Sequence, residues 1–254
     1  MWRAPEYCAA ALVLAALFGP SCADGVGSAD DATKARDPAV AGPMMVALAD
    51  WPDATAQGYL SGPSRTTRRL GDEVRGGSCR GPISLAVLTP PYAGVTIQSQ
   101  PTLSWFLGAD TGARVEVELY ADDGVDPLLT EIYPDGLPAG FHGLALADYG
   151  VRLETDVAYE WSVAVICDPD DPAGDIVSVG AIRHVAAPPD LLRQLDGASL
   201  ERRAELLVEY GIWYGALESL AGLVERHPKS EQWREARDRL LGQVGLHDAA
   251  AYDP

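Results

Sequence analysis

Two cysteines, Cys79 and Cys167, are the residues best suited to covalent chemistry. Cys79 stands in GSCRG (residues 77–81), which has the G-x-C-x-G form of a nucleophile elbow, a sharp turn that exposes the sulfur. Such an elbow needs a strand before the cysteine and a helix after it. Here an unpatterned segment precedes Cys79 and a strand pattern follows it. The local pattern therefore favours a structural cysteine over a nucleophile.

An acidic run, DPDDPAGD, offers the carboxylates Asp168, Asp170, Asp171 and Asp175. Calcium takes about six to eight oxygen ligands on a flexible loop, and four carboxylates with nearby carbonyls approach that number. The spacing matches no EF-hand loop, and the prolines and glycine of the run are equally typical of a turn whose aspartates cap their own backbone amides. A calcium site and a plain turn both stay open.

Other catalytic patterns are missing from the sequence. The four histidines are scattered without an H-E-x-x-H pair, and there is no G-x-S-x-G, no P-loop and no dinucleotide fingerprint. We therefore expect a non-enzymatic protein, with an enzyme of unfamiliar type as the remaining alternative.

The amino terminus has the pattern of a secretory leader. Residues 8–18 (CAAALVLAALF) are uncharged and apolar but too short to span a bilayer, and Ser21 and Ala23 suit cleavage before Asp24. Residues 1–23 are thus expected to be a signal peptide. Lipidation at Cys22 is an alternative, although the position three residues earlier holds Gly19 rather than a leucine-like residue. We expect an exported protein, periplasmic or extracellular, with no transmembrane segment in the mature chain.

Export bears on the cysteines and on possible partners. Removing residues 1–23 takes away Cys8 and Cys22, so Cys79 and Cys167 remain in a compartment that favours disulfides, and one bridge between them is expected. The removed segment carries one charge of each sign, so the mature chain keeps the full-length net charge of −18. Such a surface repels nucleic acid and anionic lipid.

The mature chain divides by composition into a tether, a β-rich region and a helical region. Residues 24–78 lack any sustained period and are expected to form a disordered or loosely ordered tether, which carries a small basic island of Arg65, Arg68 and Arg69. Residues 79–187 read as short β-branched and aromatic runs separated by Pro, Gly and Asp. Residues 188–248 have a helical period, and residues 249–254 form a tail.

The β-rich region predicts an all-β sandwich. Seven candidate strands begin at Ile83, Pro101, Ala113, Pro127, Phe141, Val157 and Asp175. Apolar and acidic residues alternate in ARVEVELY, as a strand with one wet face requires. In the sixth run, Tyr159, Trp161 and the following alternate residues share one face, which is typical of the tyrosine corner and inner face of an immunoglobulin-like or fibronectin-III-like domain. Trp105 would then be the opposing core tryptophan. The overall class is therefore α+β.

The helical region predicts three helices, with Gly245 as a stop signal. Its middle part resembles one tetratricopeptide repeat, a pair of antiparallel helices with small residues at the crossing points. The positions that match are Ala204, Gly211, Ala216, Leu220, Leu223 and Pro228. A single copy cannot stack into a solenoid, so we expect one capped hairpin that docks on the sandwich.

Several motifs in order resemble the bacterial family called domain of unknown function 928. They are RGGSCRGP (75–82), PTLSWF (101–106), YEWSVAVICDPDDP (159–172), YGIWYGALESLAGL (210–223) and LLGQVGL (240–246). The sequence departs from the family pattern after Trp105 and at Gly215, where an acidic residue is usual. The resemblance implies an exported protein in which Cys79 and Cys167 are family positions, and it implies no activity or substrate.

These features favour a binding or interaction module of the bacterial envelope, most simply one that binds another protein. Trp213 and Tyr214, at the hinge of the helical pair, are the candidate partner-binding residues, and packing between the two regions is the alternative role for them. A second hypothesis is a calcium- or carbohydrate-binding module built on the sandwich loops.

Overall fold

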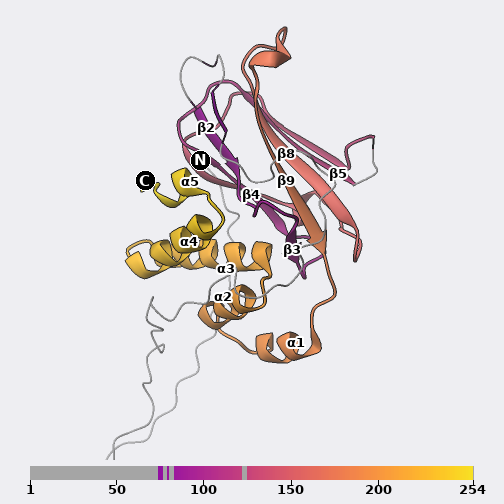
Figure 1. Cartoon of the computed structure of the whole chain (residues 1–254), viewed down its shortest axis with the longest axis vertical. Helices are drawn as coiled ribbons and strands as arrows, with labels where there is room; N and C mark the ends of the chain where they lie inside the picture. The colour runs from indigo at the N-terminus through magenta and orange to yellow at the C-terminus, as the bar shows by residue number, and fades with distance from the viewer. Residues whose placement is uncertain (1–73, 77–78, 80–82, 122–124, 254) are drawn as a thin grey trace, which may run out of the picture. The chain divides into compact units, whose positions relative to one another are not determined.

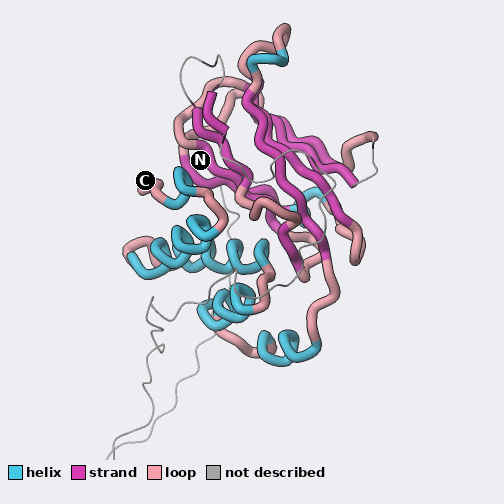
Figure 2. The backbone as a smooth tube through the Cα atoms, viewed as in Figure 1, coloured by secondary structure: helices cyan, strands magenta, loops and turns pink. Residues whose placement is uncertain are grey.

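The computed structural model describes residues 74–76, 79, 83–121 and 125–253. The predicted signal peptide and nearly all of the predicted tether lie outside these residues. Within them the fold is α+β, with two β-sheets followed by five helices in the C-terminal part (Figures 1 and 2).

The first sheet has four strands in the order β1-β2-β4-β7, and every neighbouring pair in it is antiparallel. Its strands are β1 (Val74–Gly76), β2 (Ile83–Val87), β4 (Thr102–Leu107) and β7 (Gly140–Ala145). The second sheet has the order β3-β9-β8-β5-β6, in which only the β3–β9 pair is parallel. Its strands are β3 (Gly94–Thr96), β5 (Arg114–Ala121), β6 (Leu129–Tyr133), β8 (Ala158–Ile166) and β9 (Ile176–His184).

The period-2 pattern of the sequence accounts for the face that each central strand buries. In β5, Val115, Val117 and Leu119 are fully buried, and their register partners in β8 include Trp161 and Val163, which are also fully buried. Successive side chains of a strand point to opposite faces, so one apolar face per sheet is enough to build a shared core. β2 contacts β9 across this core, and the backbone amide of Val87 donates to Ser178 Oγ at 3.0 Å.

Five helices follow the second sheet. They are α1 (Pro189–Leu195), α2 (Leu200–Glu209), α3 (Trp213–Arg226), α4 (Glu231–Gln243) and α5 (His247–Ala250). Ser199 caps α2 by accepting a hydrogen bond from the amide of Arg202, and Gly245, with φ of 88°, follows the end of α4 as the sequence predicts. The helix α3 packs against both β3 and β4 (Figure 1). One apolar core runs from the sheets into the helices without dividing near residue 188.

The structure confirms all seven predicted strands and corrects the expectation elsewhere. β1 lies inside the segment predicted to be a tether, and β3 was not foreseen, because three-residue strands carry too little pattern to be seen in sequence. Two short helices, α1 and α5, were also missed. The predicted tail instead packs inward, since the Tyr252 ring lies 5.2 Å from that of Phe106.

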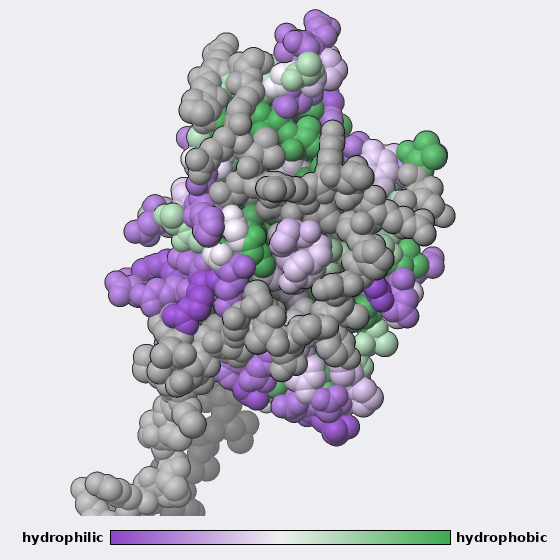
Figure 3. Space-filling model, in the orientation of Figure 1, coloured by the Kyte–Doolittle hydropathy of each residue, from purple (hydrophilic) through white to green (hydrophobic). Residues whose placement is uncertain are grey.

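Hydrophilic residues predominate over the helical part of the face shown in Figure 3. None of the described helices is both long and apolar enough to cross a membrane.

Candidate functional site

The predicted disulfide between Cys79 and Cys167 is present, with Cα atoms 4.8 Å apart. Cys79 lies in the connection from β1 to β2, whereas Cys167 directly follows β8 of the other sheet. The bridge therefore ties the two sheets together across 88 residues of sequence. A sulfur held in a disulfide is no nucleophile, so the elbow alternative finds no support.

The acidic turn uses most of its carboxylates on its own backbone. Asp168, Asp171 and Asp175 each accept a hydrogen bond from a nearby main-chain amide, at 3.0, 3.2 and 2.9 Å respectively. Asp171 begins a short 3₁₀ turn, Pro172–Gly174. These contacts are the ones that aspartates make in a strand-connecting turn.

Calcium binding by Asp168, Asp170, Asp171 and Asp175 stays a prediction. Among the described residues, no three acidic, histidine or cysteine side chains are grouped closely enough to hold a metal ion. If calcium does bind at this turn, millimolar calcium will raise the melting temperature of the protein above its value in chelator. Equal melting temperatures in the two conditions would exclude the site.

Trp213 and Tyr214 lie inside the protein, which corrects the expectation that they form a partner-binding surface. Their exposed fractions are 5% and 2%. Trp213 Nε1 donates to the carbonyl oxygen of Leu88 at 2.8 Å, so the first turn of α3 is fastened to the end of β2. The alternative role, packing between the helical and β-rich regions, is the one that the structure supports.

The Tyr214 hydroxyl reaches between the two sheets. It accepts a hydrogen bond from Trp161 Nε1 at 2.9 Å and donates to the carbonyl oxygen of Ala181 at 3.1 Å, with Thr89 Oγ1 at 3.2 Å. Burial raises the pKa of Tyr214, while its contacts with Thr89 and Trp161 act in the opposite direction. The ring also needs Gly94, because a Cβ at that position would stand 2.7 Å from Tyr214 Cε2. The start of α3 is thus locked into the core between the two sheets.

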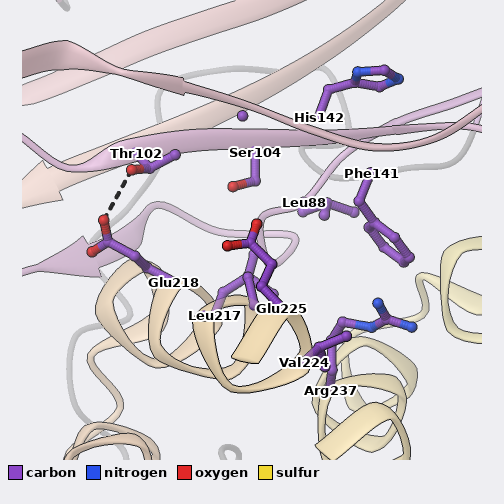
Figure 4. Close-up of a pocket in the computed structure, with 13 residues that line it drawn as sticks. Leu88, Thr102, Ser104, Phe141, His142, Leu217, Glu218, Val224, Glu225 and Arg237 are labelled. Atoms are coloured by element: carbon purple, nitrogen blue, oxygen red, sulfur yellow. Dashed lines mark hydrogen bonds between the residues drawn. The ribbon is translucent and has the colours of Figure 1, made fainter. Parts of the chain in front are cut away.

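A cleft of about 440 Å³ lies between the first sheet and the helices, further along α3. Thr102, Ser104 and Phe141 line it from β4 and β7. These side chains alternate with Leu103 and Trp105, which point into the core between the sheets. Figure 4 shows Thr102 and Ser104 facing α3. His142 points to the other side of the sheet, where its ring stacks on Trp105 at 5.5 Å. The outer face of β4 and β7 is therefore the floor of the cleft.

The opposite wall is α3, which contributes apolar and acidic side chains. Leu217 and Val224 supply carbon surface, and the small residue Ala221 lies exposed at the rim. Glu218 Oε1 accepts a hydrogen bond from Thr102 Oγ1 at 2.9 Å, drawn as the dashed line in Figure 4. Glu225 is exposed, and its carboxylate points toward Ser104. Since the α-helix rises about 1.5 Å per residue, the two glutamates stand about 10 Å apart on one side of α3.

The far end of the cleft is closed by Arg237 of α4. Its guanidinium lies 4.0 Å from the centroid of the Phe141 ring, and Nε and Nη2 both donate to Asp238 Oδ1, at 2.9 and 2.8 Å. Burial raises the pKa of Asp238, and the guanidinium beside it acts in the opposite direction. Arg237 is thus already engaged by a ring and a carboxylate, whereas Glu218 and Glu225 have no ion-pair partner among the described residues.

The side chains of this cleft are chemically suited to bind a cationic group with an apolar stem. An apolar stem can lie on the carbon surface while its charge meets the glutamates, as lysine and arginine side chains do elsewhere. Among the cleft residues described here, none is a cysteine, and no serine is paired with a histidine base, since His142 points away.

Sequence reasoning missed Glu218, Glu225, Phe141 and Arg237. The only signal was two acids seven residues apart on a helical pattern, which an ordinary solvated helix face also has. What distinguishes them is the strand β4 opposite, which lies more than a hundred residues away in the sequence.

Comparison with known proteins identifies the family but no activity. No curated protein matches the chain. A multi-domain immunophilin from Arabidopsis thaliana is similar over 73% of this chain and 96% of its own, at 7% identity and a TM-score of 0.16, a likeness too weak to support any inference. The family model described as Domain of Unknown Function (DUF928) matches residues 66–253, about three quarters of the chain. The chain therefore belongs to the DUF928 family.

Proposed function

We propose that the protein is an exported, non-enzymatic binding module of the bacterial envelope that holds a basic segment of a partner protein in the cleft between β4, β7 and α3. The observation that carries the proposal is a largely apolar cleft lining that also holds two α3 carboxylates, Glu218 and Glu225, without ion-pair partners among the described residues. Charge complementarity of this kind steers association and selects partners.

The cleft is formed by rigid elements, and this rigidity favours a role in recognition. Thr102 and Ser104 belong to a strand paired on both sides, and α3 is fixed at its first turn by Trp213 and Tyr214. A preformed site loses little conformational entropy when it is occupied. In this proposal Trp213 and Tyr214 act as supports of the site and not as its contact surface.

The finer fold assignment is part of the same proposal. We take the two sheets as an immunoglobulin-like or fibronectin-III-like sandwich. The Tyr159 hydroxyl accepts a hydrogen bond from the Glu154 amide at 2.9 Å, which supports a tyrosine corner, and Trp105 is buried as the core tryptophan. We take α2 and α3 as a tetratricopeptide-like hairpin, supported by their mutual packing and by the burial of Ala204 and Ala216.

Site-specific photocrosslinking tests the binding role. A photoreactive residue at Ala221, on the rim of the cleft, should capture one envelope protein reproducibly, and the crosslink should map to a basic segment of that protein. The matched control is the same probe at Leu192, which is exposed on α1 and is not among the residues that line the cleft. Equal capture from both positions would contradict the proposal.

Neutralising the two cleft glutamates is expected to weaken partner binding about tenfold or more, since even one close charge pair across an interface contributes roughly 1.5 kcal/mol or more. The change Glu218→Gln/Glu225→Gln keeps an acceptor for Thr102, so the fold should be preserved. Titration of the captured partner by calorimetry measures the effect.

The control variant is Glu231→Gln/Glu235→Gln, which removes the same charge from exposed positions on the neighbouring helix α4. It should leave the dissociation constant within about twofold. A similar loss in both variants would mean that overall charge, and not the cleft, attracts the partner.

A further inference from the structure

We propose that residues 64–70 of this same chain (SRTTRRL) occupy the cleft when no partner is bound, with Arg65 and Arg68 meeting Glu218 and Glu225. The inference rests on the proposed function in that it takes the cleft as a site for basic segments. It adds that the chain carries its own competitor for this site.

The charge of this segment matches the cleft. Residues 24–73 contain five cationic residues, and three of them, Arg65, Arg68 and Arg69, fall within 64–70. The full chain has a net charge of −18, so this island is a local exception. Carboxylates that lack an ion-pair partner suit these arginines, and the described part of the cleft offers two, Glu218 and Glu225.

The spacing of the charges also matches. Glu218 and Glu225 stand about 10 Å apart along α3, since seven residues of helix rise about 1.5 Å each. Arg65 and Arg68 are three residues apart, which in an extended chain is also about 10 Å. One extended segment can therefore present an arginine to each glutamate at once.

The segment can reach the cleft from the place where β1 begins. Val74 pairs with Leu85 in an antiparallel ladder, so the start of β1 lies beside the carboxyl end of β2, and Leu88, just beyond that end, lines the cleft. Leu85 in turn pairs with Leu107 of β4. From Val74 to the position of Thr102 the path crosses two strand spacings and five residues of β4, or about 20 Å.

The chain outside the structure is long enough for this path. Six residues separate Arg68 from Val74 and nine separate Arg65 from it, spans of up to about 20 and 30 Å when extended. A short tether gives its end an effective concentration in the millimolar range, so even a weak contact is occupied within one molecule. A second copy of the chain would have to overcome repulsion between two highly acidic molecules, which favours the chain's own segment.

The first experiment measures binding of a fluorescent peptide with the sequence of residues 64–70 to the full mature protein. The change Arg65→Gln/Arg68→Gln in the protein should let this peptide bind about tenfold tighter or more, because the tethered competitor is weakened. The charge-matched control Lys34→Gln/Arg36→Gln should leave the affinity unchanged. The change Glu218→Gln/Glu225→Gln should abolish peptide binding in both backgrounds.

Equal peptide affinity in the parent and in Arg65→Gln/Arg68→Gln would overturn the inference while leaving the cleft a site for basic peptides. Absence of peptide binding in every variant would overturn it as well. In that case capture of a partner by the Ala221 photoprobe still decides whether the proposed function holds.

The same Ala221 photoprobe in purified protein locates the segment directly. An intramolecular crosslink from position 221 to residues 64–70, lost in Glu218→Gln/Glu225→Gln, is the expected result. A crosslink to these residues that appears only in a dimer band would assign the occupant to a second copy, and a crosslink elsewhere would place the segment outside the cleft. Both results overturn the inference.

Discussion

Replacing both cysteines, Cys79→Ser/Cys167→Ser, is expected to lower the free energy of unfolding by about 4 kcal/mol. The bridge closes a loop of 88 residues, and the entropy that a crosslink removes from the unfolded chain grows with loop length toward this value. The effect should be large because the bridge joins two sheets that are otherwise held together by packing. Urea unfolding followed by tryptophan fluorescence measures it.

The unmodified protein treated with a reductant is the matched control, since it keeps both sulfurs and loses only the bond. It should show the same loss as the double serine variant. A midpoint that moves by less than the equivalent of about 1 kcal/mol would show that the sheets need no covalent tie.

Substitutions of Tyr214 are expected to have the second large effect on the free energy of unfolding. The change Tyr214→Phe should lower the free energy of unfolding by about 2 kcal/mol, because the buried Trp161 Nε1–H loses its acceptor at the Tyr214 hydroxyl. Tyr214→Ala should cost about 4 kcal/mol, since it also leaves a cavity where the ring packs against Gly94. Thermal or urea unfolding of the purified variants gives both values.

Tyr210→Phe provides the control for this series. The Tyr210 hydroxyl contacts Asp190 and Gln194 at the solvent-exposed surface, so its loss should leave the free energy of unfolding nearly unchanged. If Tyr214→Phe proved as mild as Tyr210→Phe, the hydrogen bonds of the Tyr214 hydroxyl would not be what holds α3 against the sheets.

These two predictions bear on the binding proposal because the disulfide and Tyr214 both hold together the elements that form the cleft. A Tyr214 variant that still folds should hold α3 less firmly and bind a partner less tightly, although Tyr214 itself is not among the residues that line the cleft. The glutamate variants should show the opposite behaviour, a loss of binding with little change in stability.

The strands could be predicted from the sequence because the pattern of apolar and polar residues that specifies a strand extends over only a few neighbouring positions. An alternation such as that of Val115, Val117 and Leu119 fixes both the strand and its buried face, so all seven predicted strands appear in the structure. The disulfide followed from the expected export and the cysteine count. The family assignment followed from several motifs in fixed order. β1 and β3 escaped because three residues make no period.

The helical pattern determined that helices form, but not what their faces touch. From the sequence, Trp213 and Tyr214 could be either exposed anchors for a partner or packing residues, because an aromatic pair at the start of a helix suits both roles. The structure decided the question through Leu88 and Trp161, which are distant in sequence and contribute the hydrogen-bond partners.

The sequence by itself therefore determined the class of the fold, seven of its strands, its three longer helices and its disulfide, because periodicity and residue type act over a few neighbouring positions. Only the tertiary structure decided that Glu218 and Glu225 face Thr102 and Ser104 across an apolar cleft. A helix face bearing two acids is ordinary in water, and it becomes a candidate site only when a strand from elsewhere in the chain supplies the opposite wall.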